Sequence, residues 1–289
     1  MNPLVSVIMS NYNGELYLHD AIKSILVQTY SNFEFLIFDD GSHDQSCEIF
    51  KEYTHDKRIT VFCEKQNKGL PTALNFLLSK AKGKYIVRMD SDDISLPQRI
   101  DEQVAFMEKN PKIDVSGTSC KIIGTHKIEY YPLSDNAIKA KLFYISGFAH
   151  PSVIIRKSSL PKGGYPIYEH SEDLAMWNLM AENGATFHNQ RQPLILYRKH
   201  LNSMTAKSHL PKQLRATRSI LHKKLSALMG AQYSENSLNL HFELICRTKK
   251  AYIKSLFWSI HLLKYKRDPW FIFNVFRYYA AYVVYITKN

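Results

Sequence analysis

The chain has 289 residues, of which 45% are hydrophobic and 22% are charged, and its formal net charge is +12. These proportions are typical of folded soluble domains and exclude a disordered or collagen-like chain. The first apolar run follows Met1-Asn2-Pro3 without a basic region or a cleavage site, so we expect no secretory signal.

Strands and helices are predicted to alternate through the first 90 residues. Apolar, β-branched runs predict the strands, and apolar residues at helical spacing predict the helices between them. The strands are expected at 4–9, 33–38, 59–64 and 84–89, and the helices at about 16–26, 45–53 and 72–81. Ser42 is expected to cap the second helix. This alternation is typical of an α/β protein with a mainly parallel sheet and helices on both faces.

Polar residues follow three of these four strands. They are Ser10, Asn11, Tyr12 and Asn13 after the first strand, Asp39, Asp40, Gly41 and Ser42 after the second, and Asp90, Ser91, Asp92 and Asp93 after the fourth. Because ligands bind beyond the carboxyl ends of parallel strands, we expect the three clusters to gather at one edge and to form the site.

Beyond residue 110 the alternation weakens. Further strands are expected at 113–116, 120–123 and 153–155. Asp173 is expected to open a helix that continues to about Asn183 and is stopped by Gly184. We expect this part of the chain to form a smaller, mixed extension of the sheet.

Three carboxylates lie within four residues after the fourth strand, on Asp90, Asp92 and Asp93. Like charges this close together are costly unless a cation compensates them. Oxygen ligands suit Mg²⁺ or Mn²⁺, which typically also hold substrate phosphates. A solvated acidic turn is the alternative, but the position after a buried strand favours the metal.

The order of these clusters resembles the family 2 glycosyltransferases, which have the GT-A fold. The resemblance covers roughly residues 4–205 and adds Asn67-Lys68-Gly69 and Glu172-Asp173 to the three clusters. It implies a GT-A-like nucleotide-binding sheet and an enzyme that uses a nucleotide-sugar donor. The plain alternative is that Asn13 and Ser42 cap helices and that Gly41 and Gly69 only turn the chain.

The resemblance also implies roles for individual residues. The nucleotide-sugar site that it implies comprises Ser10, Asn11, Tyr12, Asn13, Asp39, Asp40, Asn67, Gly69, Arg88, Asp90 and Ser91. Asp39 would be the partner of the base. Asp90 and Asp92 would lie at the ribose and the metal-bridged pyrophosphate.

Glu172 and Asp173 form the catalytic pair that the resemblance implies. Asp173 resembles the general base that takes the acceptor hydroxyl's proton as its oxygen attacks the anomeric carbon. Direct displacement of this kind inverts the anomeric centre. The alternative is structural, because Ser171 followed by two acids also suits the capping and the dipole of a helix amino terminus.

Two further groups extend the implied site. Residues 197–203 resemble the family's late Arg-x-His-x-x-Ser segment, in which His200 would meet the metal and Arg198 the diphosphate or the acceptor side. A plain surface position is the alternative for both residues. His150, just before the strand expected at 153–155, would line the acceptor side, or it is a structural histidine.

The net charge is divided unequally along the chain. Residues 1–206 contain 23 basic and 23 acidic residues, whereas residues 207–289 contain 15 and 3. The latter region is also rich in aromatic residues, among them Trp258 and Trp270. This mixture suits helices that lie in the interface of an anionic membrane. Packing onto the catalytic domain is one alternative. Nucleic-acid binding is another, and we do not expect it because no binding motif is found.

The four cysteines, Cys47, Cys63, Cys120 and Cys246, lie far apart without paired spacing. Such spacing suits reduced, inert thiols in a cytosolic protein better than disulfides or a zinc site.

The sequence therefore predicts a nucleotide-sugar-binding half over 1–110, an acceptor-binding and catalytic half over 111–206, and a basic, aromatic helical appendage over 207–289. By resemblance, the chain is an inverting hexosyltransferase that depends on Mn²⁺ or Mg²⁺. Its donor would be a UDP-hexose, and its acceptor a saccharide on a lipid diphosphate, in bacterial surface-polysaccharide or O-antigen assembly. It would act in the cytoplasm, at the inner face of the cell membrane. A sugar nucleotidyltransferase is the alternative enzyme, but residues 10–14 lack its glycine-rich phosphate-binding loop.

Overall fold

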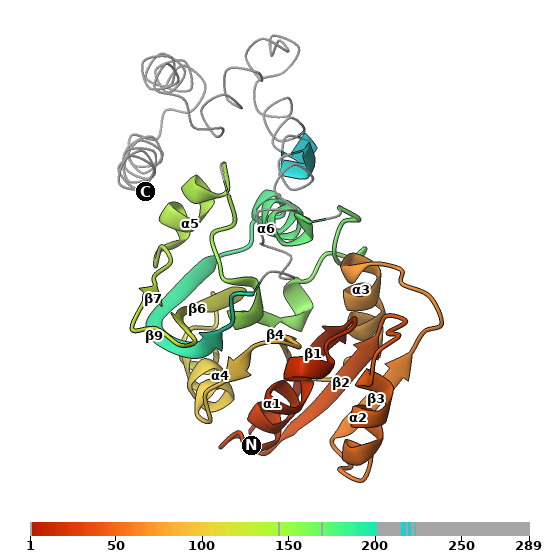
Figure 1. The fold of residues 1–289 in the computed structure, drawn as a ribbon. Coiled ribbons are helices and arrows are strands. Elements are labelled where there is room, and N and C mark those ends of the chain that lie inside the picture. Colours follow the sequence, from red (N-terminus) through yellow and green to blue (C-terminus); the bar gives the residue numbers. More distant parts are fainter. Residues whose placement is uncertain are drawn as a thin grey trace, which may run out of the picture.

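A computed structural model shows the fold of the chain and describes residues 2–143, 145–168, 170–200, 215–217, 219, 220 and 223 (Figure 1). The predictions for the other residues of the basic region, including its two tryptophans and Cys246, lie outside the described residues.

The regular elements extend from residue 5 to residue 197. The strands are β1 (Val5–Asn11), β2 (Phe33–Asp39), β3 (Ile59–Cys63), β4 (Tyr85–Asp90), β5 (Ile94–Ser95), β6 (Val115–Ile122), β7 (Ile128–Glu129), β8 (Ile154–Arg156) and β9 (Phe187–Tyr197). The helices are α1 (Glu15–Leu26), α2 (Ser46–Tyr53), α3 (Leu70–Lys80), α4 (Arg99–Lys109), α5 (Asp135–Lys141) and α6 (Glu172–Glu182), with short 3-10 helices at His150–Ser152 and Lys157–Ser159.

The strands form one sheet in the order β3-β2-β1-β4-β8-β6-β9-β5, with β7 paired to β6. The first four strands in this order are parallel to one another. β8 is antiparallel to both β4 and β6, so the sheet becomes mixed from that point. The α/β class, the parallel first half and the mixed extension are as predicted. The boundary predicted at residue 110 falls in the loop between α4 and β6, and both halves contribute strands to the same sheet.

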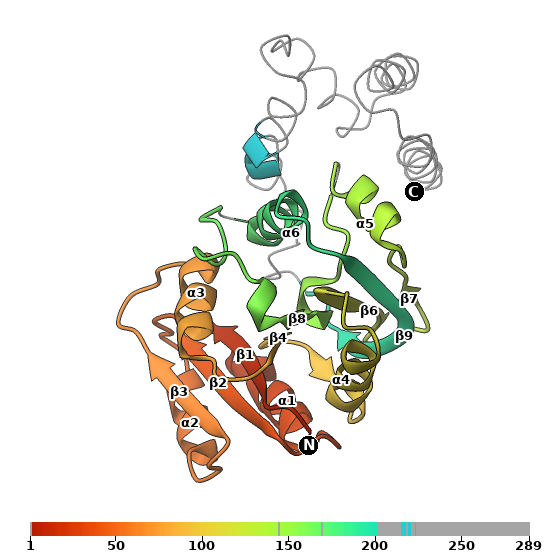
Figure 2. The ribbon, with the colours of Figure 1, turned by 180° about the vertical axis from the view of Figure 1, so that it is seen from behind.

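Helices cover both faces of the sheet, and each face has its own apolar core (Figures 1 and 2). One core joins the sheet to α1, α2 and α4, and the other joins it to α3, α5 and α6. The alternation of side chains along each strand supplies both cores, as Val7 and Ile8 of β1 show by facing opposite clusters. Because helices cover both faces of the sheet, the carboxyl edge of the parallel strands is the place where a site can form.

Two local predictions were wrong. Residues 113–116 and 120–123 belong mostly to one strand, β6, whose middle residues are polar but fully buried, and whose backbone pairs with β9 through a bulge. Ser42 does not cap α2, because that helix begins only at Ser46, whose N–H donates to the Asp44 carboxylate at 3.0 Å. Ser42 binds Asp39 instead.

The described part of the basic region packs on α6. Ile220 is only 5% exposed and belongs to the apolar cluster beside that helix. The hydroxyl of Thr217 lies 3.4 Å from that of Ser171, the residue before α6. Among the described residues, no helix combines the length and the apolar character needed to cross a membrane.

The described cysteines, Cys47, Cys63 and Cys120, are all free thiols. Burial raises the pKa of each thiol, which disfavours the reactive thiolate. This agrees with the expectation that they are inert.

Candidate active site

The three polar clusters meet at one edge of the sheet, as expected from the parallel strands. β1 lies between β2 and β4, and its last residues are paired in register with theirs: Ser10 with Asp90, and Asn11 with Asp39. Neighbouring strands are about 4.8 Å apart, so the turns that follow them are side by side.

Asp39 is the buried centre of the first part of this edge. Its carboxylate accepts hydrogen bonds from Asn11 Nδ2 at 2.9 Å, from the Ser42 hydroxyl at 2.7 Å and from the Ser42 N–H at 3.0 Å. Asp39 is therefore a fixed carboxylate on a rigid strand end, and the exposed ring of Tyr12 lies in the loop after the adjacent β1.

Asp40 holds the loop that contains Asn67 and Gly69. Its two carboxylate oxygens accept the N–H groups of Lys68 at 2.8 Å and Gly69 at 2.9 Å. Gly41 next to it has φ +76°, and a Cβ there would lie 2.8 Å from the backbone of Gln66. The turn after β2 and the loop after β3 are thus locked together, and Asp40 serves this contact.

The turn after β4 gathers three carboxylates, on Asp90, Asp92 and Asp93, whose oxygens can lie within 4.8 Å of one another. Asp93 is fully buried, and its Oδ2 has no hydrogen-bond partner among the described residues. Burial and then the charges of its two neighbours raise the pKa of Asp93 well above its ordinary value. The turn therefore carries the electrostatic cost that a bound cation would relieve.

Arg88 lies behind this turn and pairs with it. Its guanidinium is 2.5 Å from Asp90, and the side chain is only 3% exposed. Nε and Nη1 of Arg88 have no hydrogen-bond partner among the described residues. The Arg88 guanidinium interacts electrostatically with both Asp90 and Glu172. This buried cation therefore lies between the acidic turn and α6.

The segment after β9 crosses the acidic turn. The N–H of Arg198 donates to Asp93 Oδ1, and its Nε donates to the carbonyl of Asp92, both at 2.8 Å. His200 Nε2 lies 2.8 Å from Asp92 Oδ2. His200 thus lies beside the acidic turn as the metal hypothesis requires. Arg198, predicted on the acceptor side, contacts the acidic turn and α1.

A second titratable cluster surrounds the start of α6. His150 Nε2 lies 3.0 Å from the Tyr165 hydroxyl, and its Nδ1 lies 3.4 Å from Glu172. Burial and the nearby Arg88 lower the pKa of His150 to about 3, so the imidazole is neutral at pH 7. Burial raises the pKa of Glu172 and of Asp173.

Several contacts of this edge have no counterpart in a sequence motif. No local pattern pointed to Tyr17 or Tyr165, because their partners Arg198, His200 and His150 come together with them only through the fold. Ser171 makes no side-chain hydrogen bond that caps α6. This weakens the structural alternative, in which Ser171 and the two acids after it serve only to cap the helix.

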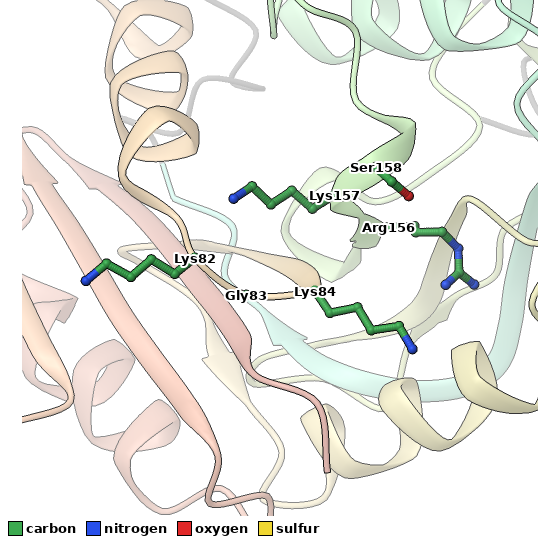
Figure 3. Close-up of a pocket in the computed structure, with 6 residues that line it drawn as sticks. All are labelled: Lys82, Gly83, Lys84, Arg156, Lys157 and Ser158. Atoms are coloured by element: carbon green, nitrogen blue, oxygen red, sulfur yellow. The ribbon is translucent and has the colours of Figure 1, made fainter. Parts of the chain in front are cut away.

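A separate hollow lies at the opposite end of β4, away from these clusters. It is lined by Lys82, Gly83, Lys84, Arg156, Lys157 and Ser158 (Figure 3). Its cationic side chains point apart, and Lys84 and Lys157 are engaged by Glu108 and by the carbonyl of Ala81. Because its cationic side chains do not converge on one point, the hollow is not a candidate binding site.

Solved structures of glycosyltransferases share this architecture. S. aureus TarS in complex with UDP-GlcNAc aligns over 84% of this chain and 71% of that chain, with a TM-score of 0.65 and 20% identity. The mannosyltransferase PcManGT from Pyrobaculum calidifontis, in complex with GDP-Man and Mn²⁺, aligns over 98% and 86%, with a TM-score of 0.56 and 16% identity. At these identities the likeness shows the fold, and the class is that of the GT-A fold.

Sequence comparison then gives the particular family. The model of the glycosyl transferase family 2 matches residues 6–164, more than half of the chain. The chain therefore belongs to this family and is a glycosyltransferase.

Individual relatives agree with this assignment. The putative glycosyltransferase EpsE of Bacillus subtilis is 35% identical over 216 residues, which cover 71% of this chain and 77% of that protein. The O-antigen biosynthesis glycosyltransferase WbnJ of Escherichia coli is 34% identical over 218 residues, which cover 72% and 84%.

Proposed function

We propose that this glycosyltransferase moves a hexose from a nucleotide sugar to a hydroxyl group of a saccharide acceptor, with inversion and with the help of Mn²⁺ or Mg²⁺. The observation that carries the proposal is the carboxylate cluster of Asp90, Asp92 and Asp93 at the carboxyl edge of a GT-A sheet. The adjacent carboxylates of Glu172, which is buried, and Asp173, which is partly exposed, supply a second acidic group for the chemistry.

The donor site in this proposal lies along the ends of β1, β2 and β4. Asp39, held by Asn11 and Ser42, would bind the base, and the loop of Tyr12 and Asn13 would cover the nucleoside. Asp40 keeps the loop of Asn67 and Gly69 in place. Ser10, Asp90 and Ser91 would meet the ribose, with Arg88 bracing Asp90 from behind. We propose a UDP-linked hexose as the donor.

The residues of the acidic turn fit a divalent cation. Carboxylate oxygens of Asp90 and Asp92 and the imidazole of His200 form a ligand set that Mn²⁺ and Mg²⁺ accept, the histidine favouring Mn²⁺. When bound, the cation would neutralise the diphosphate and make it a better leaving group. Asp93 is buried and accepts the Arg198 N–H, so its role would be to shape the turn.

Asp173 is the proposed general base. It is partly exposed, and its raised pKa makes its carboxylate a stronger base than an ordinary aspartate. It would accept the proton of the acceptor hydroxyl while that oxygen attacks the anomeric carbon from the side opposite the diphosphate. A single displacement of this kind inverts the anomeric configuration. His150, neutral and held by Tyr165, would line the acceptor side with Glu172.

The biological setting is also part of the proposal. WbnJ is an O-antigen biosynthesis glycosyltransferase, which supports a role in bacterial surface-polysaccharide assembly with a lipid-diphosphate-linked saccharide as acceptor. The basic, aromatic region 207–289 would bring the enzyme to the anionic inner face of the cell membrane from the cytoplasm.

The test uses the full chain with Mn²⁺ and a panel of UDP-, GDP- and dTDP-hexoses, and measures release of free nucleoside diphosphate. We expect release with one donor class, and its loss on chelation or in Asp92→Asn. Asp101→Asn, which removes an exposed carboxylate on α4, is the matched control and should keep the activity. Metal-independent release would refute the cation, and release of pyrophosphate from a sugar phosphate and a nucleoside triphosphate would refute the reaction.

A further inference from the structure

The first two turns of α1 contact the segment after β9 that crosses the acidic turn. The Tyr17 ring lies under the Arg198 guanidinium, with 4.3 Å between the Arg198 Cζ and the ring centroid. The same ring is 5.1 Å from the His200 ring, at an angle of 46°. Asp20, three residues further along the helix, lies 3.3 Å from Arg198 Nη2. Two residues three apart on a helix share a face, so α1 presents a ring and a carboxylate together.

This face of α1 is not the one that builds the core. The buried apolar residues of the helix are Leu18, Ala21, Ile22 and Ile25, whereas Tyr17 is only partly buried and Asp20 is exposed. The two rings and the guanidinium therefore form a polar stack at the surface of the site. A tyrosine in this position contributes little to the apolar core, and its contacts are directed at residues 198 and 200.

Arg198 connects this stack to the acidic turn. Its N–H donates to Asp93 and its Nε to the carbonyl of Asp92, so the acidic turn fixes the backbone before His200, while the Tyr17 ring packs against the guanidinium. His200 Nε2 then reaches Asp92 Oδ2 at 2.8 Å. The position of the imidazole depends on contacts that come from the first helix of the chain.

We propose that Tyr17 is a positioning residue that holds His200, through direct contact and through Arg198, in the place where it meets the diphosphate end of a nucleotide sugar. The proposal deepens the proposed function and rests on it. α1 starts directly after the loop of residues 12–14 that follows β1, so one rigid helix would set both the nucleoside loop and the diphosphate end of the donor site. No part of the donor needs to touch Tyr17 for this effect.

The binding test measures UDP affinity by calorimetry with the full chain, in Mn²⁺ and in chelator. Tyr17→Leu removes the π face, and we expect its Mn²⁺-dependent UDP affinity to fall about three- to thirty-fold, the range for one or two cation–π and ring contacts. Tyr17→Phe keeps the ring and should bind as the wild type does. Leu16→Ala, at a 75% exposed neighbour on the same turn, is the matched control and should also bind normally.

A double-mutant cycle separates positioning from general damage. If Tyr17 acts through His200, Tyr17→Leu should cause no further loss in a His200→Ala background, because the group it positions is gone. Equal losses in both backgrounds, or unchanged affinity in Tyr17→Leu, would overturn the proposal. Thermal midpoints within about two degrees of the wild type confirm that the variants are folded.

A ligand-free measurement distinguishes this inference from the proposed function. The imidazole resonances of His200, assigned by their loss in His200→Ala, should shift in Tyr17→Leu and stay in place in Tyr17→Phe and Leu16→Ala. Unshifted resonances would refute the inference by themselves. If they shift but the wild type binds no UDP in Mn²⁺, the positioning contact stands and the proposed donor site is what fails.

Discussion

Asp173 and Glu172 are adjacent in the chain but differ in environment. Glu172 is 5% exposed and lies against His150, whereas Asp173 is partly exposed. A base must reach its substrate, so exposure favours Asp173 for the role and favours Glu172 as the residue that orders His150.

Asp173→Asn is expected to reduce turnover by roughly 10²–10⁴, because an amide cannot accept the acceptor's proton. Donor affinity and the thermal midpoint should stay near the wild type, since loss of a first-turn charge costs about 1 kcal/mol or less. Turnover with a working acceptor and calorimetry with the donor provide the two measurements. The acidic limb of the wild-type pH profile should lie above that of an ordinary aspartate, because burial raises the pKa of Asp173 and the base acts ionised. Normal turnover in Asp173→Asn would transfer the role to Glu172.

Asp93 gives a prediction about stability instead of catalysis. Its pKa is raised in the folded chain, first by burial and then by the charges of Asp90 and Asp92. A raised carboxyl pKa means that the folded state prefers the proton, so its contribution to stability is present at low pH and is lost as the pH rises through the folded pKa. Each unit of such a shift corresponds to about 1.4 kcal/mol.

We therefore expect Asp93→Asn to raise the thermal midpoint of the metal-free protein at pH 7. Asparagine keeps the Oδ1 that accepts the Arg198 N–H and removes the buried charge. The gain should shrink as the pH is lowered and disappear below about pH 3, where the wild-type carboxyl is protonated in both the folded and the unfolded state. A midpoint that falls at pH 7 would contradict the raised pKa.

Among the elements, the turn after β2 requires its glycine. Gly41 has φ +76°, and a Cβ at this position would lie only 2.8 Å from the Gln66 backbone, which leaves no room for a side chain. Gly184, which ends α6, has φ +86°, but nothing lies within 4 Å of its Cβ position. At both positions a residue other than glycine would be strained because φ is positive, but its side chain would clash with a neighbour only at position 41.

Gly184→Ala should cost about 1 kcal/mol, the strain alone, and Gly41→Ala should cost roughly 2–4 kcal/mol. Because Gly41 adjoins Asp39 and Asp40, its replacement should also weaken nucleotide binding, whereas Gly184→Ala should not. Denaturant unfolding and donor calorimetry on both variants test this pair. Equal costs at the two positions would show that the β2 turn adapts to a side chain.

The elements also show how far the sequence determines the prediction. β1, β2 and β4 are mostly apolar runs with polar ends, so the strands and the edge that they form were predictable. β9 was not predicted because its first half is largely polar and lacks an apolar pattern; it contains His188, Gln190, Arg191, Gln192 and Pro193. β6 was predicted as two strands because its middle residues are polar. Contacts such as His150 with Tyr165, or Tyr17 with His200, join loops and helices that only the sheet brings together.

For the whole molecule, the distribution of charge along the chain is more informative than the net charge. Residues 224–289 alone hold 10 basic and 3 acidic residues, beside a neutral catalytic part. Ile220, however, is buried against α6, so this residue contributes to the apolar core beside that helix. A deletion that tests membrane binding must therefore keep Ile220.

A chain that ends at Lys223 is expected to keep its thermal midpoint and to lose at least tenfold in affinity for vesicles of phosphatidylcholine with one third phosphatidylglycerol. Wild-type binding should weaken as salt rises from 0.05 to 0.5 M, since the attraction is screened, and neutral vesicles should bind much less. A chain that ends at Lys207 also loses Ile220 and should be destabilised by roughly 2–5 kcal/mol, so its behaviour cannot be attributed to charge. Vesicle flotation and duplex DNA binding are measured on the same proteins. Undiminished vesicle binding by the Lys223 form would place the membrane contact in residues 1–223, and tight DNA binding by the full chain at physiological salt would favour a nucleic-acid role for the basic region.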